Sequence, residues 1–293
     1  MKTALIIPLY KQSQYWSNML IAIEKLTVRP FCVYVMMDRP SGIEYVTVKN
    51  QCSNHELINK YKVYNIQEIP EYVGRPNITP DQTLFLTGHR RNIAIEYAIA
   101  DGCDSFVCID GDCVPQEDLI KSHMETHEMN YPVVSCGRRR ESKHGYKDQR
   151  ETANNLSKYR LFSGNSHQII STYDLLYTSA ITWSCNIGFN LKAIKLLKAV
   201  NKRYYGNEEV FHSSFLGTWG GEDGFIGIQA FLSGAKVILL NDVKSGIKHI
   251  EHDRPTNKYS GESFGYYLGE QTALFKAMLE NSPMTIDFFN DLD

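Results

Sequence analysis

The chain has 293 residues, of which 43% are hydrophobic, and a formal net charge of −2 at pH 7. This length and composition suffice to bury one large core, or a core and a smaller lobe, without disulfides. The near-neutral charge of the whole chain gives no argument for a nucleic-acid or membrane partner.

The cysteines and the N-terminus predict where the protein resides. There are seven cysteines, an odd number with no CxxC pair, so reduced and buried thiols are expected. The apolar start MKTALIIPLY is too short for a signal peptide, and no segment approaches the roughly 20 apolar residues of a transmembrane helix. We therefore expect a cytoplasmic protein.

Short β-rich runs alternate with helical patterns in the first half of the chain. The expected elements are strands at Thr3–Leu9, Cys32–Met37, Lys62–Ile66 and Ser105–Ile109, and helices at Tyr15–Leu26 and Arg90–Ala100, the latter closed by Gly102. This alternation predicts an α/β fold with a mostly parallel sheet covered on both faces. Because ligands bind beyond the carboxyl ends of such strands, Pro8, Asp38 and Asp110 are expected to share one cleft.

The second half begins with a polar segment near 138–180 that has little periodicity. Between Arg138 and Arg160 it holds eight Lys/Arg against three Asp/Glu. Beyond it, we expect Thr182–Val200 to begin as a strand and turn helical. Glu222–Leu232 is expected to be an amphipathic helix closed by Gly234, and Lys236–Leu240 a strand.

Asp110-Gly111-Asp112 directly follows an apolar strand-like run. Two carboxylates one residue apart can both reach one hard cation if the backbone turns sharply between them, and Gly111 permits that turn. The same residues also fit a β-turn whose acids cap a helix beginning near Gln116.

Three further motifs carry ionisable groups. Trp219-Gly-Gly-Glu-Asp223 places two acids at a helix N-terminus, where they complement the helix dipole, although capping alone does not explain Trp-Gly-Gly. The segment Lys248–Arg254 offers His249, His252 and carboxylates to manganese or a similar ion. His123 and His127 lie four residues apart, but the intervening Glu is not where the metalloprotease pattern requires it, so a solvated helix face is expected.

The order of these motifs resembles the GT-A glycosyltransferases, above all the family 2 enzymes, the β-1,4-galactosyltransferases and the polypeptide N-acetylgalactosaminyltransferases. The resemblance runs from about Ala4 to Arg254. Ile6–Tyr10 is similar to the first nucleotide-binding strand, and Gly88–Asn92 to the stretch before the metal motif. Asp110–Asp112 is similar to the D-x-D motif, Trp183–Asn190 to the donor-sugar segment, and Trp219–Asp223 to the W-G-G-E-D motif. Arg90 departs from the family 2 pattern, which has a small residue there.

The resemblance implies one GT-A domain over residues 1–293, with a nucleotide-sugar-binding half at 1–115 and an acceptor-binding and catalytic half at 116–293. It implies nucleotide contacts from Pro8, Tyr10, Asp38, Arg91, Asn92 and Asp110. It implies contacts with the donor or acceptor sugar from Trp183, Asn186, Trp219, Gly221 and Glu222. Mn²⁺ or Mg²⁺ would be held by Asp112 and His252, with Asp110 beside them, since His252 aligns better than His249.

The implied reaction is metal-dependent transfer of a sugar from a nucleotide-sugar to an acceptor hydroxyl, with Asp223 as general base and inversion of configuration. A UDP-sugar is favoured, because Asp38 can accept a hydrogen bond from uracil in this family. A glycan acceptor is favoured, followed by DNA carrying hydroxymethylated pyrimidines.

The basic segment is either a solvated loop or a site where Arg138, Arg139 and Arg140 bind an anionic acceptor. Such an acceptor would be a charged glycan, a lipid-linked diphosphate or modified DNA. Two other classes stay open, a nucleotidyltransferase and a non-catalytic sugar- or nucleotide-binding module. The first usually carries a Gly-rich loop after its first strand, which Pro8-Leu-Tyr-Lys does not match.

Overall fold

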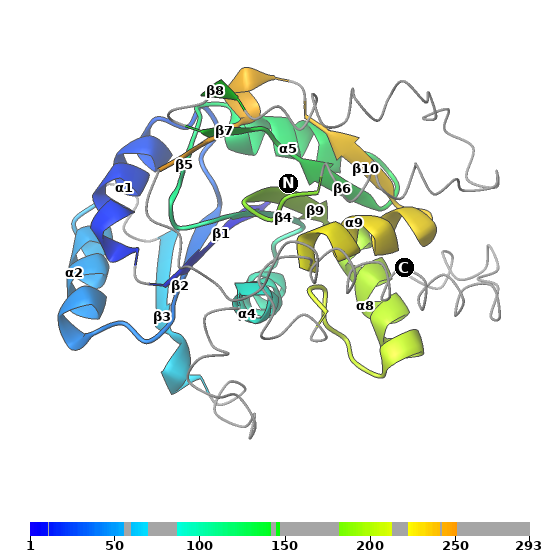
Figure 1. Cartoon of the computed structure of the whole chain (residues 1–293), viewed down its shortest axis with the longest axis horizontal. Coiled ribbons are helices and arrows are strands. Elements are labelled where there is room, and N and C mark those ends of the chain that lie inside the picture. Colours follow the sequence, from blue (N-terminus) through cyan, green and yellow to red (C-terminus); the bar gives the residue numbers. More distant parts are fainter. Residues whose placement is uncertain are drawn as a thin grey trace.

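A seven-stranded sheet in the order β10-β6-β9-β4-β1-β2-β3 forms the centre of the molecule (Figure 1). This computed structural model describes residues 1–10, 12–55, 60–69, 87–141, 145–146, 182–212, 222–240 and 242–250. The strands of the sheet are β1 (Thr3–Leu9), β2 (Cys32–Met37), β3 (Tyr61–Asn65), β4 (Ser105–Ile109), β6 (Val133–Cys136), β9 (Asn186–Asn190) and β10 (Lys236–Leu239). All neighbouring pairs are parallel except those of β9, which runs antiparallel to both β4 and β6.

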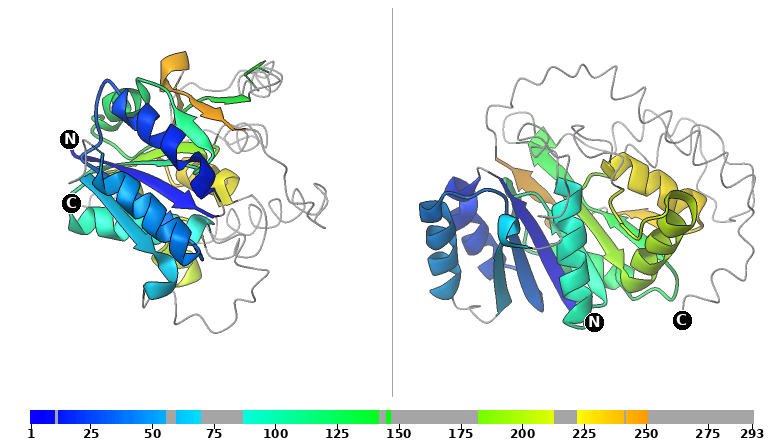
Figure 2. Two further views of the ribbon diagram at one scale, coloured as in Figure 1. Left: turned by 90° about the vertical axis from the view of Figure 1, so that its left-hand side faces the viewer. Right: turned by 90° about the horizontal axis from the view of Figure 1, so that it is seen from below.

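The helices cover both faces of this sheet. On one face lie α1 (Trp16–Glu24), α2 (Gly42–Ser53) and α5 (Leu119–His127), and on the other α4 (Thr87–Ala100), α8 (Leu191–Tyr205) and α9 (Glu222–Leu232). Figure 1 shows α1 and α2 on one side of β1 to β3, with α4, α8 and α9 on the other, and the left view of Figure 2 shows α1 and α2 from the front. The layers are those predicted from the alternation of strands and helices.

Strand β1 shows how the sequence builds the two cores. Its residues are all buried, and they alternate between the two faces. Ala4 and Ile6 pack with α4 and α8, whereas Leu5, Ile7 and Leu9 pack with α1, α2 and α5. Burying each Leu or Ile contributes about 1.5–3 kcal/mol, so a continuous apolar run is stable only where both faces are covered.

Local signals fix the ends of several helices. Ser41 and Glu44 form a reciprocal capping box at the start of α2, and the side chain of Asn190 caps α8 by accepting from the Ala193 amide. Gly102 and Gly234 follow α4 and α9 in the left-handed conformation, with φ of 77° and 88°. Both glycines therefore act as the predicted helix ends.

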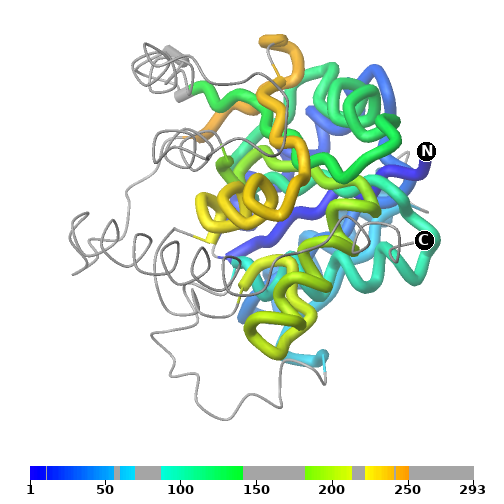
Figure 3. Tube along the Cα trace, turned by 90° about the vertical axis from the view of Figure 1, so that its right-hand side faces the viewer, coloured from blue at the N-terminus to red at the C-terminus, as the bar shows by residue number. Residues whose placement is uncertain are grey.

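A smaller sheet, in the order β5-β11-β7-β8, lies against the carboxyl end of β4. It contains β5 (Cys113–Pro115), β7 (Arg139–Glu141), β8 (Gly145–Tyr146) and β11 (Ile247–His249). Figure 3 shows β11, in orange, beside the green chain of β7. Segments that are more than one hundred residues apart in sequence therefore meet next to Asp110.

Most predicted elements agree with the structure. The predicted bounds of β1, β2, β4 and α9 are those observed, and α1, α4, β3 and β10 differ by one to three residues at their ends. The main sheet draws strands from both predicted halves of the chain, whose division stays a prediction. Most of 138–180 lies outside the described residues. Within the part of the chain that the structure describes, no helix has both the length and the apolar composition needed to cross a bilayer.

Candidate active site

Three strands of the main sheet end at a common edge with polar groups. Pro8 lies near the end of β1, while Asp38 and Asp110 directly follow β2 and β4, which flank β1. The Asp38 amide donates to the Leu9 carbonyl at 2.9 Å, which holds the ends of β1 and β2 together. The structure thus brings these positions to one edge, as their places in the sequence predict.

Two arginines at the start of α4 link these strand ends. Arg90 pairs with Asp38 and Arg91 pairs with Asp110. Both guanidinium side chains are buried, and a buried charge requires such a partner. The Arg90 guanidinium also lies over the Tyr10 ring, 5.5 Å from its centroid. Arg90, the departure from the family 2 pattern, therefore has a defined place beside the predicted base-binding carboxylate.

The turn at Asp110-Gly111-Asp112 is packed directly against β1. A Cβ atom on Gly111 would lie 2.4 Å from Leu9 Cδ2 and 3.0 Å from the Pro8 carbonyl oxygen. Its φ is not in the left-handed region, so the requirement for glycine is space. The chain continues into β5, and α5 begins only at Leu119, so these acids do not cap a helix.

Asp112 is almost completely buried and faces several polar groups. Its Oδ2 accepts from Gln12 Nε2 at 2.8 Å and lies 3.5 Å from His249 Nε2. Its Oδ1 accepts from Cys113 Sγ at 3.3 Å. His249 reaches this position because β11 pairs with β5, opposite Cys113. His252, the predicted metal ligand, lies outside the described residues.

Helix α9 brings two more carboxylates to the same place. Glu222 Oε1 lies 3.7 Å from Arg91 Nη1. Asp223 accepts from the backbone amides of Ser184, at 3.2 Å, and Gly224, at 2.8 Å. Asp110, Glu222 and Asp223 thus converge around Arg91, and Asp112 acts on Asp110 beside them. Trp219 and Gly221 lie outside the described residues.

Among the described residues, the carboxylates of the site outnumber its cations. Burial raises the pKa of Glu222 to about 7, with a further rise from Asp223 and an opposing effect from Arg91. Partial loss of water around the half-buried Asp110 also raises its pKa, and Asp112 adds to the shift while Arg91 and Arg139 oppose it. Both pKa values are raised first by burial and then by neighbouring carboxylates, so a cation bound here would stabilise the ionised forms. An oxygen-rich, electron-rich site of this kind fits a divalent cation such as Mn²⁺ or Mg²⁺.

Two predicted ligand-binding amides have protein partners. Asn186 donates to the Arg138 and Ser245 carbonyls and its Oδ1 lies 2.9 Å from His123 Nε2. Asn92 exchanges two hydrogen bonds of 2.8 Å with the backbone of Phe211. Both amides hold the framework of the site, and for each a contact with a ligand stays a prediction.

The prediction of a solvated face at His123 and His127 is wrong. Both side chains are buried between α5 and the sheet. The Oγ atom of Ser135 lies 2.6 Å from His123 Nδ1 and 2.7 Å from His127 Nε2, and Ser105 Oγ lies 2.8 Å from His127 Nδ1. Burial lowers the pKa of His123 to about 4. Spacing within one helix does not show which face the sheet covers, so the sequence carried no signal for this network.

The three consecutive arginines lie in different surroundings. Arg138 is buried, Arg139 is half-buried with its guanidinium 5.9 Å from the centroid of the Trp183 ring, and Arg140 is exposed. Arg139 is also the one whose charge acts on Asp110. A role of these residues toward an anionic acceptor stays a prediction.

The amino-acid sequence matches no protein-family profile and no curated protein. The fold does match solved structures. TarS of S. aureus in complex with UDP-GlcNAc is similar over 100% of this chain and 70% of that chain, with a TM-score of 0.58 and 16% identity. A mannosyltransferase of Pyrobaculum calidifontis in complex with GDP-Man and Mn²⁺ is similar over 99% of this chain and 67% of that chain, with a TM-score of 0.54 and 13% identity. These likenesses show that the chain has the GT-A fold.

Proposed function

We propose that this chain is a metal-dependent glycosyltransferase that moves a sugar from a nucleotide-sugar to an acceptor hydroxyl with inversion of configuration. The observation that carries the proposal is the convergence of three carboxylates on Arg91 at the carboxyl edge of the sheet, those of Asp110, Glu222 and Asp223, with Asp112 beside Asp110. Two similar folds were solved with UDP-GlcNAc and with GDP-Man and Mn²⁺, which supports a nucleotide-sugar as donor.

The nucleotide would lie along the ends of β1, β2 and β4. Asp38, beside Pro8 and Tyr10, is the proposed contact of the base, and Asp110 that of the ribose. Asp38 already accepts from Gln67 Nε2 at 2.6 Å and pairs with Arg90. A carboxylate has about four acceptor positions, but the Asp38 side chain is fully buried, so uracil N3–H would reach it only after one of these partners moves aside.

Asp110 and Asp112 would hold the divalent ion. His252 is the proposed third ligand, and His249 is a second candidate because its Nε2 lies 3.5 Å from Asp112 Oδ2. A bound Mn²⁺ or Mg²⁺ supplies positive charge that stabilises the departing diphosphate.

Asp223 is the proposed general base, which takes the proton from the acceptor hydroxyl as that oxygen attacks the anomeric carbon. Its carboxylate is held in place by the Ser184 and Gly224 amides. Glu222 would bind a sugar hydroxyl beside it. Trp183, whose ring lies under the Arg139 guanidinium, would give the sugar an aromatic surface, as would Trp219.

For the acceptor we propose a glycan, with hydroxymethylated DNA as the alternative. Of the three arginines, Arg139 is best placed to contact an anionic acceptor, because it is half-buried next to Trp183 and its charge acts on Asp110.

The test is the release of nucleoside diphosphate by the chain with Mn²⁺ and a panel of UDP- and GDP-sugars. Oligosaccharides, anionic glycans and hydroxymethylated DNA are added in turn as acceptors. General base catalysis contributes about 10²- to 10⁴-fold, so Asp223→Asn is expected to lower turnover by that factor. The matched control is Asp242→Asn, because Asp242 caps a short helix through the Lys244 amide and Asn caps equally well.

The anomeric configuration of the product, measured by NMR, tests inversion. Near-normal turnover by Asp223→Asn would show that Asp223 is not the general base. Release of pyrophosphate would instead identify a nucleotidyltransferase, and binding without any release a non-catalytic module.

A further inference from the structure

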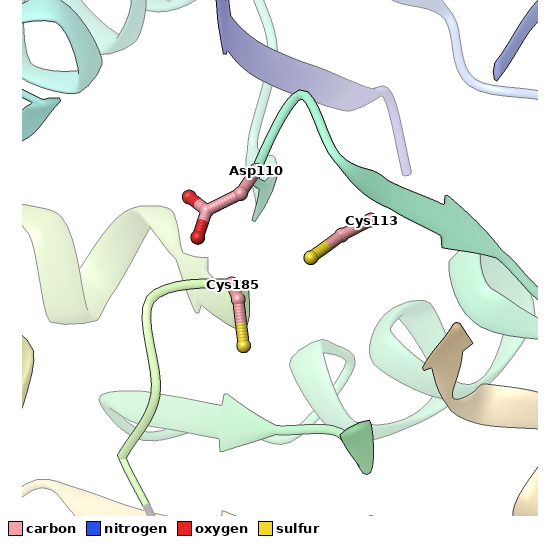
Figure 4. A group of neighbouring side chains, drawn as sticks. All are labelled: Asp110, Cys113 and Cys185. Carbon is pink, nitrogen blue, oxygen red and sulfur yellow. The ribbon is translucent and has the colours of Figure 1, made fainter. Parts of the chain in front are cut away.

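Two thiols lie directly beside the D-x-D turn. Cys113 is the first residue of β5, and Cys185 lies in the turn before β9. Figure 4 shows Asp110, Cys113 and Cys185 as neighbours, with the Cys113 sulfur atom directed toward the other two residues. One oxygen of Asp110 and the two sulfur atoms all lie within 4.8 Å of one another.

This spacing is close to that of a thiolate metal site. In a tetrahedral zinc site with Zn–S bonds of about 2.3 Å, neighbouring ligand atoms lie roughly 3.8 Å apart. The three atoms therefore need to move inward by about 1 Å or less to share one ion, a shift on the scale of side-chain adjustment. Asp112 Oδ1, which accepts from Cys113 Sγ at 3.3 Å, lies beside the same space as a possible fourth ligand.

The ligand types distinguish this space from the proposed Mn²⁺ or Mg²⁺ site. Soft sulfur ligands select ions such as Zn²⁺ and Cd²⁺, whereas Mg²⁺ prefers oxygen. The two oxygens of Asp112 face different groups, Oδ2 toward Gln12 and His249 and Oδ1 toward Cys113. Asp110 borders both the oxygen-ligand site and the space between the two thiols. Its side chain is 32% exposed, whereas the two cysteines are buried. An ion would therefore enter past Asp110.

We propose that Cys113, Cys185 and Asp110 form a binding site for a thiophilic divalent cation, Zn²⁺ or Cd²⁺, next to the oxygen-ligand site. Occupation of this site inhibits sugar transfer, because the ion takes Asp110 away from Arg91 and from the nucleotide. The binding is independent of the proposed transferase activity, whereas the inhibition rests on it.

The binding is tested by titrating the reduced, metal-free full-length chain with Cd²⁺ and recording the thiolate-to-metal charge-transfer absorption. We expect one Cd²⁺ per chain at this site, with an absorption band that Cys113→Ser and Cys185→Ser each reduce. Loss of an outer-sphere partner costs about 10- to 100-fold in metal affinity, so loss of a thiolate ligand is expected to cost at least as much. Cys52→Ser is the matched control, since Cys52 is an equally buried thiol on α2, in another part of the fold.

Asp110→Asn keeps both thiols and is expected to weaken Cd²⁺ binding while the charge-transfer band persists. Circular dichroism and thermal unfolding identify any variant that fails to fold. Absence of a thiolate band in the wild-type chain, or an unchanged band in the Cys113→Ser, Cys185→Ser double variant, would overturn the site. Unchanged affinity in Asp110→Asn would also contradict it.

Inhibition is measured separately, as the effect of Zn²⁺ on nucleoside diphosphate release in the presence of Mn²⁺. Each variant is compared with its own rate without Zn²⁺. We expect Cys185→Ser to need at least about tenfold more Zn²⁺ for the same inhibition. Equal inhibition of Cys185→Ser and wild type by Zn²⁺ would contradict the claim that the site inhibits sugar transfer. The Cd²⁺ spectra test metal binding at the site even if no transferase activity is found.

Discussion

Gly111 is the residue on which the shape of the D-x-D turn depends. A Cβ atom there would meet two flexible side-chain ends, Leu9 Cδ2 and Gln12 Oε1, and the backbone oxygen of Pro8, which cannot move without shifting β1. The sequence suggested a glycine that permits a sharp turn, and the structure shows that the reason is the closeness of β1. The carboxylates on either side are thereby held at the ends of β1 and β4.

Gly111→Ala is expected to lower the free energy of unfolding by about 1–3 kcal/mol, the usual cost of overpacking. It is also expected to weaken UDP binding, because the added methyl group pushes the turn away from β1. Urea denaturation and calorimetry measure the two effects. Gly42→Ala is the control, since nothing lies within 4 Å of a Cβ atom there. Equal stability of the two variants would contradict the close packing.

Glu222 gives the site a pH dependence in the metal-free chain. Its pKa is raised from 4.5 to about 7, so the folded protein binds a proton that the unfolded chain releases. Its contribution to stability therefore falls as the pH rises from about 4.5 to about 7. Glu222→Gln lacks this effect, and its stability relative to wild type is expected to increase over that range. Urea denaturation in EDTA at several pH values measures it, and a constant difference would contradict the raised pKa.

At the scale of elements, two helices fix the site through buried polar side chains. Helix α4 uses Arg90 and Arg91 to pair with the ends of β2 and β4. Helix α5 uses His123 and His127 to contact Ser135 on β6 and, through His123, Asn186 on β9. Such buried groups, each paired with a partner on a strand or at its end, favour one arrangement of helix and sheet.

The pKa of His123, lowered from 6.5 to about 4, predicts acid sensitivity of the α5 contact. Between these values the unfolded chain binds the proton and the folded chain does not, so the stability from this group is lost as the pH falls from about 6.5 to about 4. His123→Gln is expected to be less stable at pH 7 but to lose less stability on acidification. Thermal unfolding from pH 7 to pH 4.5 measures this, and parallel losses in both proteins would be the opposite result.

At the scale of the whole molecule, the elements with continuous apolar runs were predictable and those held by long-range pairing were not. Strands β1, β2 and β4 are buried on both faces and read as uninterrupted apolar segments. Helix α2 escaped prediction because it buries only Val48 and Cys52, although its capping box was a signal in the sequence. The three-residue strand β11 is defined by its partners β5 and β7, so the place of His249 followed only from the fold.

In the candidate site, too, some residues were predictable from the sequence and others follow only from the fold. The acids at 110, 112, 222 and 223 were predicted from motifs, and the fold brings them together. Asp112 accepts from Gln12, which belongs to none of the motifs, and Asp223 accepts from Ser184, which lies in the predicted donor-sugar segment. Because these partners are 100 and 39 residues apart in the sequence, only the folded molecule reveals the two contacts.

The most direct test of the proposed nucleotide–metal site is calorimetric titration of the chain with UDP, with and without Mn²⁺, for wild type and Asp112→Ala. Mn²⁺ is expected to strengthen UDP binding to wild type, and Asp112→Ala is expected to lose this gain by about tenfold or more because it lacks a metal ligand. Asp242→Asn serves as the control and is expected to match wild type. Mn²⁺ and UDP binding that is unchanged in Asp112→Ala would contradict a nucleotide–metal site at the Asp110–Asp112 turn.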